Sequence, residues 1–183
     1  MTEIWLVRHG EAAAAFDEDT DPPLSAKGRA QAERTALALQ NCMKTGARLL
    51  TSPKRRAMET AEPFAKLSGS DLTIDARFIE LPSPEGFASR GKWIEQALAS
   101  QWGDLPLAVQ TWRESLEGAL VSLVTPTVVF THFLVINSVA ARISGDDQVM
   151  QCLPANASIH HLRIDESGWQ WCARGEMLES VVN

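Results

Sequence analysis

Apolar residues occur along this chain in short continuous runs and in stripes that repeat every three or four positions. The runs predict buried β-strands and the stripes predict helices packed against them. Strands are predicted over residues 3–8, 48–51, 72–75, 127–131, 158–164 and 169–173. Helices are predicted over residues 26–44, from Ser52 or Pro53 through Phe64, near 92–101, and over 107–124 and 133–143. This alternation favours an α/β fold, a three-layer sandwich with a mainly parallel central sheet and helices on both faces.

Two segments depart from the alternation. The turn Glu166-Ser167-Gly168 between the last two strands indicates an antiparallel hairpin at one edge of the sheet. Residues 81–106 are interrupted by prolines and glycines, and we expect them to form an irregular excursion in which Trp93 and Trp102 are candidates for substrate contact. We find neither repeats nor a linker, so a single domain over residues 1–183 is expected.

Composition narrows the classes of partner. The net charge of −6 argues against nucleic acid and anionic membranes as partners. No apolar run is long enough to span a bilayer, and the N-terminus lacks the features of a secretory signal. The three cysteines are widely spaced, which indicates neither a disulfide framework nor a zinc site. We therefore expect a cytoplasmic protein, either a monomer or a homodimer.

Polar side chains suited to phosphate chemistry follow several predicted strands. In mainly parallel sheets, ligands bind beyond the carboxyl ends of the strands, so these side chains are expected to meet. They are Arg8 and His9 after the first strand, Ser52 with Arg55 and Arg56 after the second, Glu80 after the third, and His132 after the strand 127–131. Together they supply a nucleophile, cations for phosphate oxygens and a proton donor, which phosphoryl transfer requires.

Four motifs carry a resemblance to a known family. Arg8-His9-Gly10, the segments Leu24–Ala32 and Ser52–Ala61, and Thr131-His132 are similar, in order and spacing, to the motifs of the histidine phosphatase superfamily. The resemblance covers roughly residues 3–160 and implies a phosphoglycerate-mutase-like fold. It also implies a metal-independent phosphomonoesterase that acts through a phosphohistidine intermediate without a cofactor.

The resemblance assigns roles residue by residue. His9 would be the nucleophile, while Arg8, Gly10, Arg56 and a protonated His132 would bind the phosphoryl group. Arg56 matches the family position better than its neighbour Arg55. The general acid would be Glu80, with Glu85 as the alternative. Asn156–Ser158 resembles the segment that precedes the last strands in this family. We expect it to support the loop around the site.

The sequence does not identify the substrate, but two features restrict it. Phe133 stands where the family often has glycine, so the pocket is expected to be narrower. Carboxylates at positions 11, 17, 18, 19 and 21 disfavour a highly anionic ligand. A small phosphorylated substrate is expected. A phosphohistidine protein phosphatase, a phosphoglycerate mutase-type phosphotransferase and a binding module without catalysis are the alternatives.

Overall fold

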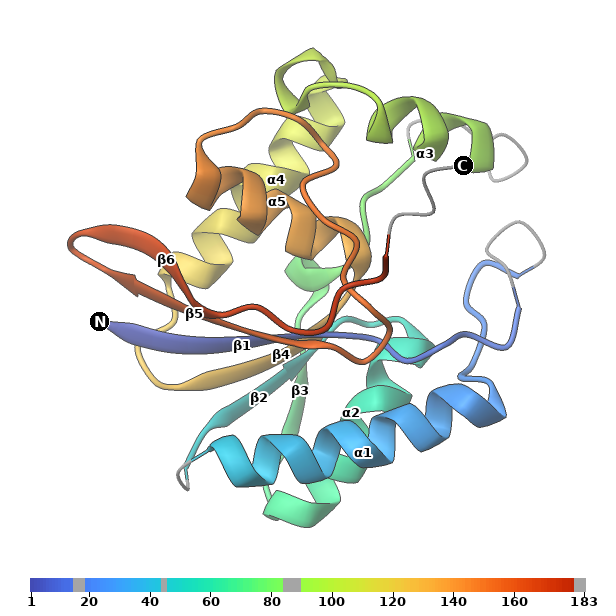
Figure 1. Ribbon diagram of the computed structural model, residues 1–183, viewed down its shortest axis with the longest axis vertical. Coiled ribbons are helices and arrows are strands. Elements are labelled where there is room, and N and C mark those ends of the chain that lie inside the picture. The colour runs from blue at the N-terminus through green and yellow to red at the C-terminus, as the bar shows by residue number, and fades with distance from the viewer. Residues whose placement is uncertain (15–18, 44–45, 84–89, 180–183) are drawn as a thin grey trace.

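The computed structural model describes residues 1–14, 19–43, 46–83 and 90–179, which form layers of helices on both faces of one sheet (Figure 1). The strands are β1 (Thr2–Arg8), β2 (Arg48–Thr51), β3 (Leu72–Ile74), β4 (Thr127–Thr131), β5 (Ile159–Asp165) and β6 (Gly168–Ala173). The helices are α1 (Ala26–Cys42), α2 (Arg55–Ser68), α3 (Arg90–Leu98), α4 (Leu107–Val121) and α5 (Phe133–Ser144), with short 3₁₀ helices η1 (Ala76–Phe78) and η3 (Trp102–Asp104).

The strand order in the sheet is β3-β2-β4-β1-β5-β6. β1, β2, β3 and β4 are parallel to one another, whereas β5 runs antiparallel to β1 and β6 antiparallel to β5. The predicted α/β class, the mainly parallel sheet and the hairpin at its edge are therefore confirmed. Since four parallel strands point the same way, the segments that follow them emerge at one edge.

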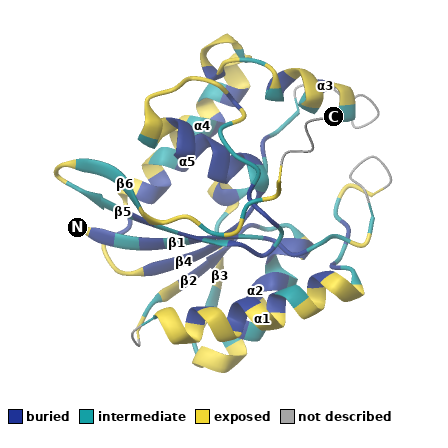
Figure 2. Ribbon diagram, in the orientation of Figure 1, coloured by how far each residue is buried: buried dark blue, intermediate teal, exposed yellow. Residues whose placement is uncertain are grey.

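Each face of the sheet is closed by a different pair of helices. Val7, Val128 and Phe130 pack with Leu39 of α1 and Phe64 of α2. On the opposite face, apolar residues of β1 and β4 pack with α4 and α5. That second cluster includes Ile4, Leu6, Val129, Leu116, Leu120, Ile136 and Val139. Figure 2 shows the result, with the central strands β1, β2 and β4 mostly buried, the edge strands more exposed, and the outer side of α1 exposed. Every residue of β4 is buried, because this strand is covered on both faces.

Some predicted boundaries were wrong by a few residues. α2 begins at Arg55 and not at Ser52 or Pro53, because the Ser52 N–H donates to the carbonyl of Phe130 at 2.9 Å and prolongs the pairing of β2. α3 spans Arg90–Leu98, two to three residues earlier than predicted. Part of the excursion is thus helical. Within the described residues, no helix combines the length and apolar character needed to cross a membrane.

Candidate active site

The candidate residues converge at the carboxyl edge of the parallel strands. Arg8 and His9 end β1, and Arg56 lies in the first turn of α2. These three residues and Glu80 line a cavity of about 560 Å³. His132, between β4 and α5, is fully buried, and its ring centroid lies 5.2 Å from that of His9. The fold therefore gathers side chains that are more than 100 residues apart in the sequence.

His9 is held in a defined orientation. Its Nδ1 lies 2.7 Å from the carbonyl oxygen of Gly10, an acceptor, so Nδ1 carries the proton and Nε2 keeps its lone pair. Arg56 Nε donates to that Nε2 at 3.2 Å. Burial and the charge of Arg56 lower the pKa of His9 to about 3. The imidazole is consequently neutral at neutral pH, with one nitrogen able to act as a nucleophile.

The backbone around His9 is fixed by the loop before β5. The His9 carbonyl accepts hydrogen bonds from Asn156 Nδ2 and from the Ala157 N–H, each at 3.2 Å. The Arg8 N–H donates to the Ser158 carbonyl at 3.1 Å. Residues 156–158 therefore support the site loop in the way that the sequence predicted.

Gly10 lies where no side chain fits. A Cβ at this position would stand 2.7 Å from the carbonyl oxygen of Gly28 in the first turn of α1. The Gly10 N–H donates to Thr60 Oγ1 at 2.9 Å, and that hydroxyl donates to the Arg56 carbonyl at 2.6 Å. Thr60 was not predicted as a site residue. Its position four residues after Arg56 on a helix was the available signal, because such residues share a face.

Arg8 and Arg56 line the cavity, whereas Arg55 does not. Arg8 donates to the Pro154 carbonyl at 2.6 Å, and its guanidinium lies 5.2 Å from the ring centroid of Phe133. Burial lowers the pKa of both Arg8 and Arg56, although both guanidinium groups keep their charge at neutral pH. Arg55 is exposed and donates to Glu59 at 3.4 Å. Two cations therefore face His9, and Arg55 lies outside the cavity.

His132 is oriented through Ser52. His132 Nε2 lies 2.7 Å from Ser52 Oγ, which also accepts from the Lys54 N–H at 3.3 Å. His132 Nδ1 is buried and has no partner among the described residues. Burial, and then the nearby His9 and Arg56, lower the pKa of His132 well below its usual range. The protonated His132 that the sequence led us to expect was therefore wrong for the free protein, since this imidazole is neutral.

Glu80 lines the same cavity as His9. Its carboxylate accepts from the N–H groups of Leu81 at 3.0 Å and Leu134 at 3.2 Å. Burial raises the pKa of Glu80, and the positive charge of Arg56 opposes this only in part. A carboxyl group that keeps its proton to higher pH is suited to general acid catalysis. The alternative residue, Glu85, lies outside the described residues.

The remaining lining has a basic rim and an apolar wall. Lys54 and Arg90 line the cavity and were not predicted. The apolar part is formed by Ile79, Leu81, Pro82, Ile94, Leu98, Phe133 and Leu134. The proposed substrate contacts of Trp93 and Trp102 were wrong, because both indoles are buried in the core and neither lines the cavity in the described part of the chain. Phe133 does line it, as its position predicted.

Acidic side chains of the loop after β1 form hydrogen bonds at the starts of α1 and α2. Glu11 accepts from Ser25 Oγ at 2.9 Å and from Lys27 Nζ at 2.8 Å. Asp21 accepts from the Arg55 N–H at 2.9 Å, at the start of α2. Residues 17 and 18 lie outside the described residues. Glu11 and Asp21 are therefore engaged with cations and amide groups near the cavity mouth, which reduces their repulsion of an anionic ligand.

Comparisons with known proteins agree with this architecture. Probable phosphoglycerate mutase GpmB of Salmonella paratyphi C is 26% identical, over 99% of this chain and 93% of that protein. Among solved structures, YhfR of Bacillus stearothermophilus has a TM-score of 0.75 at 21% identity, over 97% of this chain and 98% of that one. A phosphoserine phosphatase from Entamoeba histolytica, in complex with 3-phosphoglyceric acid, has a TM-score of 0.72 at 17% identity, over 97% and 98%.

A family match covers the same elements. The sequence model of the histidine phosphatase superfamily (branch 1) matches residues 4–176, which run from within β1 to just beyond β6. The match thus includes every strand end that contributes to the cavity. It also accounts for the order of the motifs around His9, Arg56 and His132. Because both the fold and nearly the whole sequence agree, this chain belongs to the histidine phosphatase superfamily.

Proposed function

We propose that this protein is a metal-independent phosphomonoesterase that hydrolyses a phosphate ester through a phosphohistidine on His9. The observation that carries this proposal is the hydrogen bond from His9 Nδ1 to the Gly10 carbonyl at 2.7 Å. It leaves Nε2 with a lone pair that accepts from Arg56 Nε, in a ring that lines the cavity and whose pKa is lowered to about 3 by burial and Arg56. A neutral imidazole with one fixed tautomer is what a nucleophilic role requires.

In the first step, His9 Nε2 attacks phosphorus, the N–P bond forms and the ester P–O bond breaks. Arg56 Nε, which donates to His9 Nε2 in the free protein, passes its hydrogen bond to a phosphoryl oxygen. Arg8 adds a second guanidinium group. Arginine is suited to this because its planar fork gives aligned, charge-assisted hydrogen bonds.

His132 contributes a further donor although it is neutral. We infer that Ser52 Oγ, which accepts from the Lys54 N–H and lies 2.7 Å from His132 Nε2, donates its own hydrogen to that nitrogen. The proton of His132 then resides on Nδ1, a buried atom with no partner in the described structure. Leaving such a donor without an acceptor costs about 1–3 kcal/mol, so a phosphoryl oxygen beside His9 would relieve that cost.

Glu80 acts first as a general acid and then as a general base. Its carboxyl group donates a proton to the departing alkoxide, and the resulting carboxylate then takes a proton from water. The water oxygen attacks phosphorus, the N–P bond breaks, and His9 and inorganic phosphate are regenerated. The raised pKa of Glu80, caused by burial, keeps the proton available for the first step. A phosphoramidate leaving group needs this proton less, so a working Glu80 favours an oxygen ester over protein phosphohistidine.

The cavity also suggests the organic part of the substrate. Its volume of about 560 Å³ lies within the range of small-molecule sites. Ile94 and Leu98 of α3 and Phe133 of α5 form an apolar wall beside the phosphate-binding groups. We therefore expect a small ester with an apolar or aromatic portion to be hydrolysed with a lower KM than a fully hydroxylated sugar phosphate.

The test is hydrolysis of an aryl phosphate from acid to neutral pH in the presence of a chelator. We expect turnover by the wild type, none by His9→Ala, and a phosphorylated His9 in rapidly quenched wild-type protein by mass spectrometry. Arg56→Ala should lose about 100-fold or more in kcat, whereas the matched control Arg55→Ala should retain the wild-type value. Full activity in His9→Ala, or turnover that chelator abolishes while circular dichroism shows the protein still folded, would contradict the proposal.

A mutase-type reaction is the second candidate, since relatives with 26–27% identity are named probable phosphoglycerate mutases. The same phosphohistidine would then pass to a hydroxyl group of the substrate and not to water. Incubation with 3-phosphoglycerate separates the two reactions. Release of inorganic phosphate supports the hydrolase, and interconversion of 3- and 2-phosphoglycerate without phosphate release supports the mutase.

A further inference from the structure

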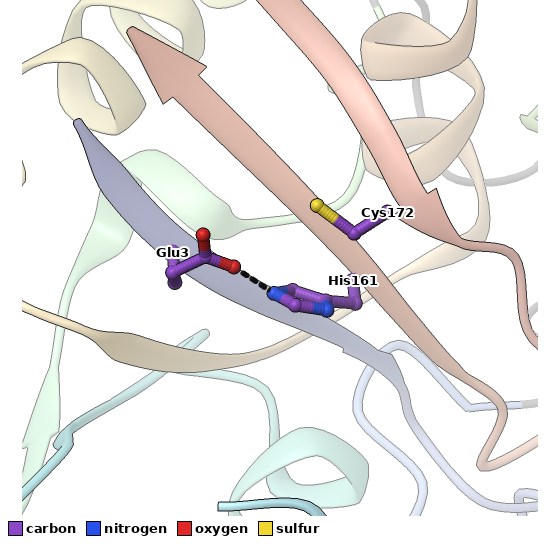
Figure 3. A group of neighbouring side chains, drawn as sticks. All are labelled: Glu3, His161 and Cys172. Atoms are coloured by element: carbon purple, nitrogen blue, oxygen red, sulfur yellow. Dashed lines mark hydrogen bonds and ion pairs between the residues drawn. The ribbon is translucent and has the colours of Figure 1, made fainter.

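A second group of reactive side chains lies on the sheet near the start of β1, at the end opposite the cavity. Glu3 of β1, His161 of β5 and Cys172 of β6 each offer one ligand atom, and these atoms all lie within 4.8 Å of one another (Figure 3). His161 Nε2 contacts Glu3 Oε2 directly. The three residues come from neighbouring strands and are exposed or partly exposed, so the group is accessible to solvent.

The strands present these side chains on one face for identifiable reasons. Ile4 and Leu162 point into the core formed with α4 and α5, so their neighbours Glu3 and His161 point to the other face. The pairing of β5 with β6 shifts between His161 and Leu162: His161 is opposite Ala173, whereas Leu162 is opposite Trp171. Cys172 is therefore the additional residue of a β-bulge.

Strand alternation and a stacked ring position two of the ligands. A β-bulge leaves one residue outside the regular pairing, and such bulges are frequent at functional sites. The Trp5 ring stacks on His161 with a centroid separation of 4.5 Å and an angle of 8°. The imidazole is thus fixed beside the carboxylate. Trp171 packs with the core on the opposite face, so strand alternation places the Cys172 thiol on the face of His161, and the bulge leaves Cys172 outside the regular pairing.

The donor set has the chemistry of a zinc site. Imidazole nitrogen, thiolate sulfur and carboxylate oxygen are the ligands that bind Zn²⁺, at about 2.0–2.3 Å each. In a tetrahedral site such donors lie roughly 3.3–3.8 Å apart, so a shift of about 1 Å by rotamer adjustment would bring the present group into range. The charges of one thiolate, one carboxylate and Zn²⁺ would balance. Arg163 of β5 is a cation that would compete with Zn²⁺ for these anionic groups, but it is paired elsewhere, with its Nε 3.3 Å from Asp165 Oδ2.

We propose that Glu3, His161 and Cys172 bind a divalent zinc ion with three protein ligands and an open fourth position for water. Binding replaces the direct contact between His161 and Glu3 and requires the Cys172 thiol to bind as the thiolate, so zinc binding releases protons. The ion links β1, β5 and β6 and stabilises the folded state. It does not take part in phosphoryl transfer, because six residues of extended chain, about 20 Å, separate Glu3 from His9.

The experiment uses Co²⁺ as a spectroscopic substitute for Zn²⁺ in the full-length protein after chelator treatment. We expect one equivalent of Co²⁺ to produce a thiolate-to-cobalt charge-transfer band and the visible absorption of a tetrahedral site, both abolished by Zn²⁺. Cys172→Ser should remove the charge-transfer band. The matched control Cys42→Ser, which changes another exposed free cysteine, should leave it unchanged.

Two further variants keep the test decisive if Cys172→Ser folds poorly. His161→Gln and Glu3→Gln should each weaken Zn²⁺ binding by about tenfold or more in a competition titration. Absence of a charge-transfer band in the wild type, or its persistence in Cys172→Ser, would overturn the proposal. These readouts do not use phosphatase activity, so a failed zinc site and a failed phosphatase assignment are distinguishable.

Discussion

In the proposed mechanism, the hydroxyl group of Ser52 determines which nitrogen of His132 carries the proton. Ser52 Oγ accepts from the Lys54 N–H, and in the proposed arrangement it donates its own hydrogen to His132 Nε2. We expect Ser52→Ala to release this constraint and to lower kcat by about tenfold to 100-fold, since a phosphate-binding donor is misplaced. Nitrogen-15 NMR of the imidazole should show the Nδ1–H tautomer in the wild type and a mixture in the variant. An unchanged tautomer would show that Ser52 only packs beside the ring.

In the proposed mechanism, the proton donated by Glu80 matters more as the leaving group becomes more basic. An alkyl phosphate leaves as a strongly basic alkoxide, whereas a nitrophenyl phosphate leaves as a weak base. We expect Glu80→Gln to reduce kcat for the alkyl ester by about 100-fold or more and for the aryl ester by much less. Because burial raises the pKa of Glu80, wild-type kcat for the alkyl ester should fall as pH rises through that raised value. Equal losses for both esters would contradict the role.

Individual site residues could be predicted where a motif and a strand end coincide. His9, Arg56 and His132 satisfy both conditions, and the structure brings them together. Lys54 and Arg90 could not be predicted as cavity residues, because their positions depend on how α2 begins and where α3 packs. The charge state of His132 could not be predicted either, because the lowering of its pKa follows from burial and from four neighbouring groups that are distant in sequence.

At the scale of elements, the first turn of α1 packs directly against the loop that follows β1. A Cβ on Gly28 would stand 2.1 Å from the Glu11 carbonyl oxygen, so Gly28→Ala must displace backbone. We expect it to lower the free energy of unfolding by about 1–3 kcal/mol and to reduce kcat, because the same loop positions His9. Denaturant titration and aryl phosphate hydrolysis measure the two effects.

Gly118 provides the matched control for this prediction. It lies within α4, is exposed, and a Cβ there would meet no atom within 4 Å. Gly118→Ala should therefore raise the free energy of unfolding by about 0.5–1 kcal/mol without changing kcat, because alanine loses less conformational freedom in a helix. Equal stability and activity in both variants would show that α1 moves away from the loop at little cost.

Most elements could be predicted from apolar periodicity, but their exact starts and their partners could not. The start of α2 depends on a hydrogen bond from Ser52 to Phe130, a residue of β4. The group around Cys172 was missed for a similar reason. Its three proposed ligands lie at positions 3, 161 and 172, and only the antiparallel pairing of β5 with its neighbours brings them together.

For the whole molecule, the buried histidines couple the stability of the fold to pH. Burial lowers the pKa of His9 to about 3 and that of His160 to about 4, and lowers the pKa of His132 as well. In the unfolded chain each imidazole has a pKa near 6.5. Below that value the unfolded state binds protons that the folded state does not, so the free energy of unfolding falls as pH falls.

Glu80 acts in the opposite direction. Its folded-state pKa is raised, so between the unfolded value near 4.5 and that raised value the folded state binds the additional proton. Acidification through this window stabilises the fold, and Glu80 offsets part of the loss caused by the histidines. A comparison of variants can separate the two contributions, because they have opposite signs.

We expect the free energy of unfolding of the wild type to decrease between about pH 7 and about pH 5, by up to about 2 kcal/mol for each neutral buried histidine. His9→Ala should show a smaller decrease, because one of these histidines is removed. Glu80→Gln should show a larger decrease, because the offsetting proton uptake is lost. Denaturant titrations of the three proteins at both pH values measure the differences. Equal decreases in all three would mean that His9 accepts a proton within the folded protein, and the neutral nucleophile in the proposed mechanism would then be wrong.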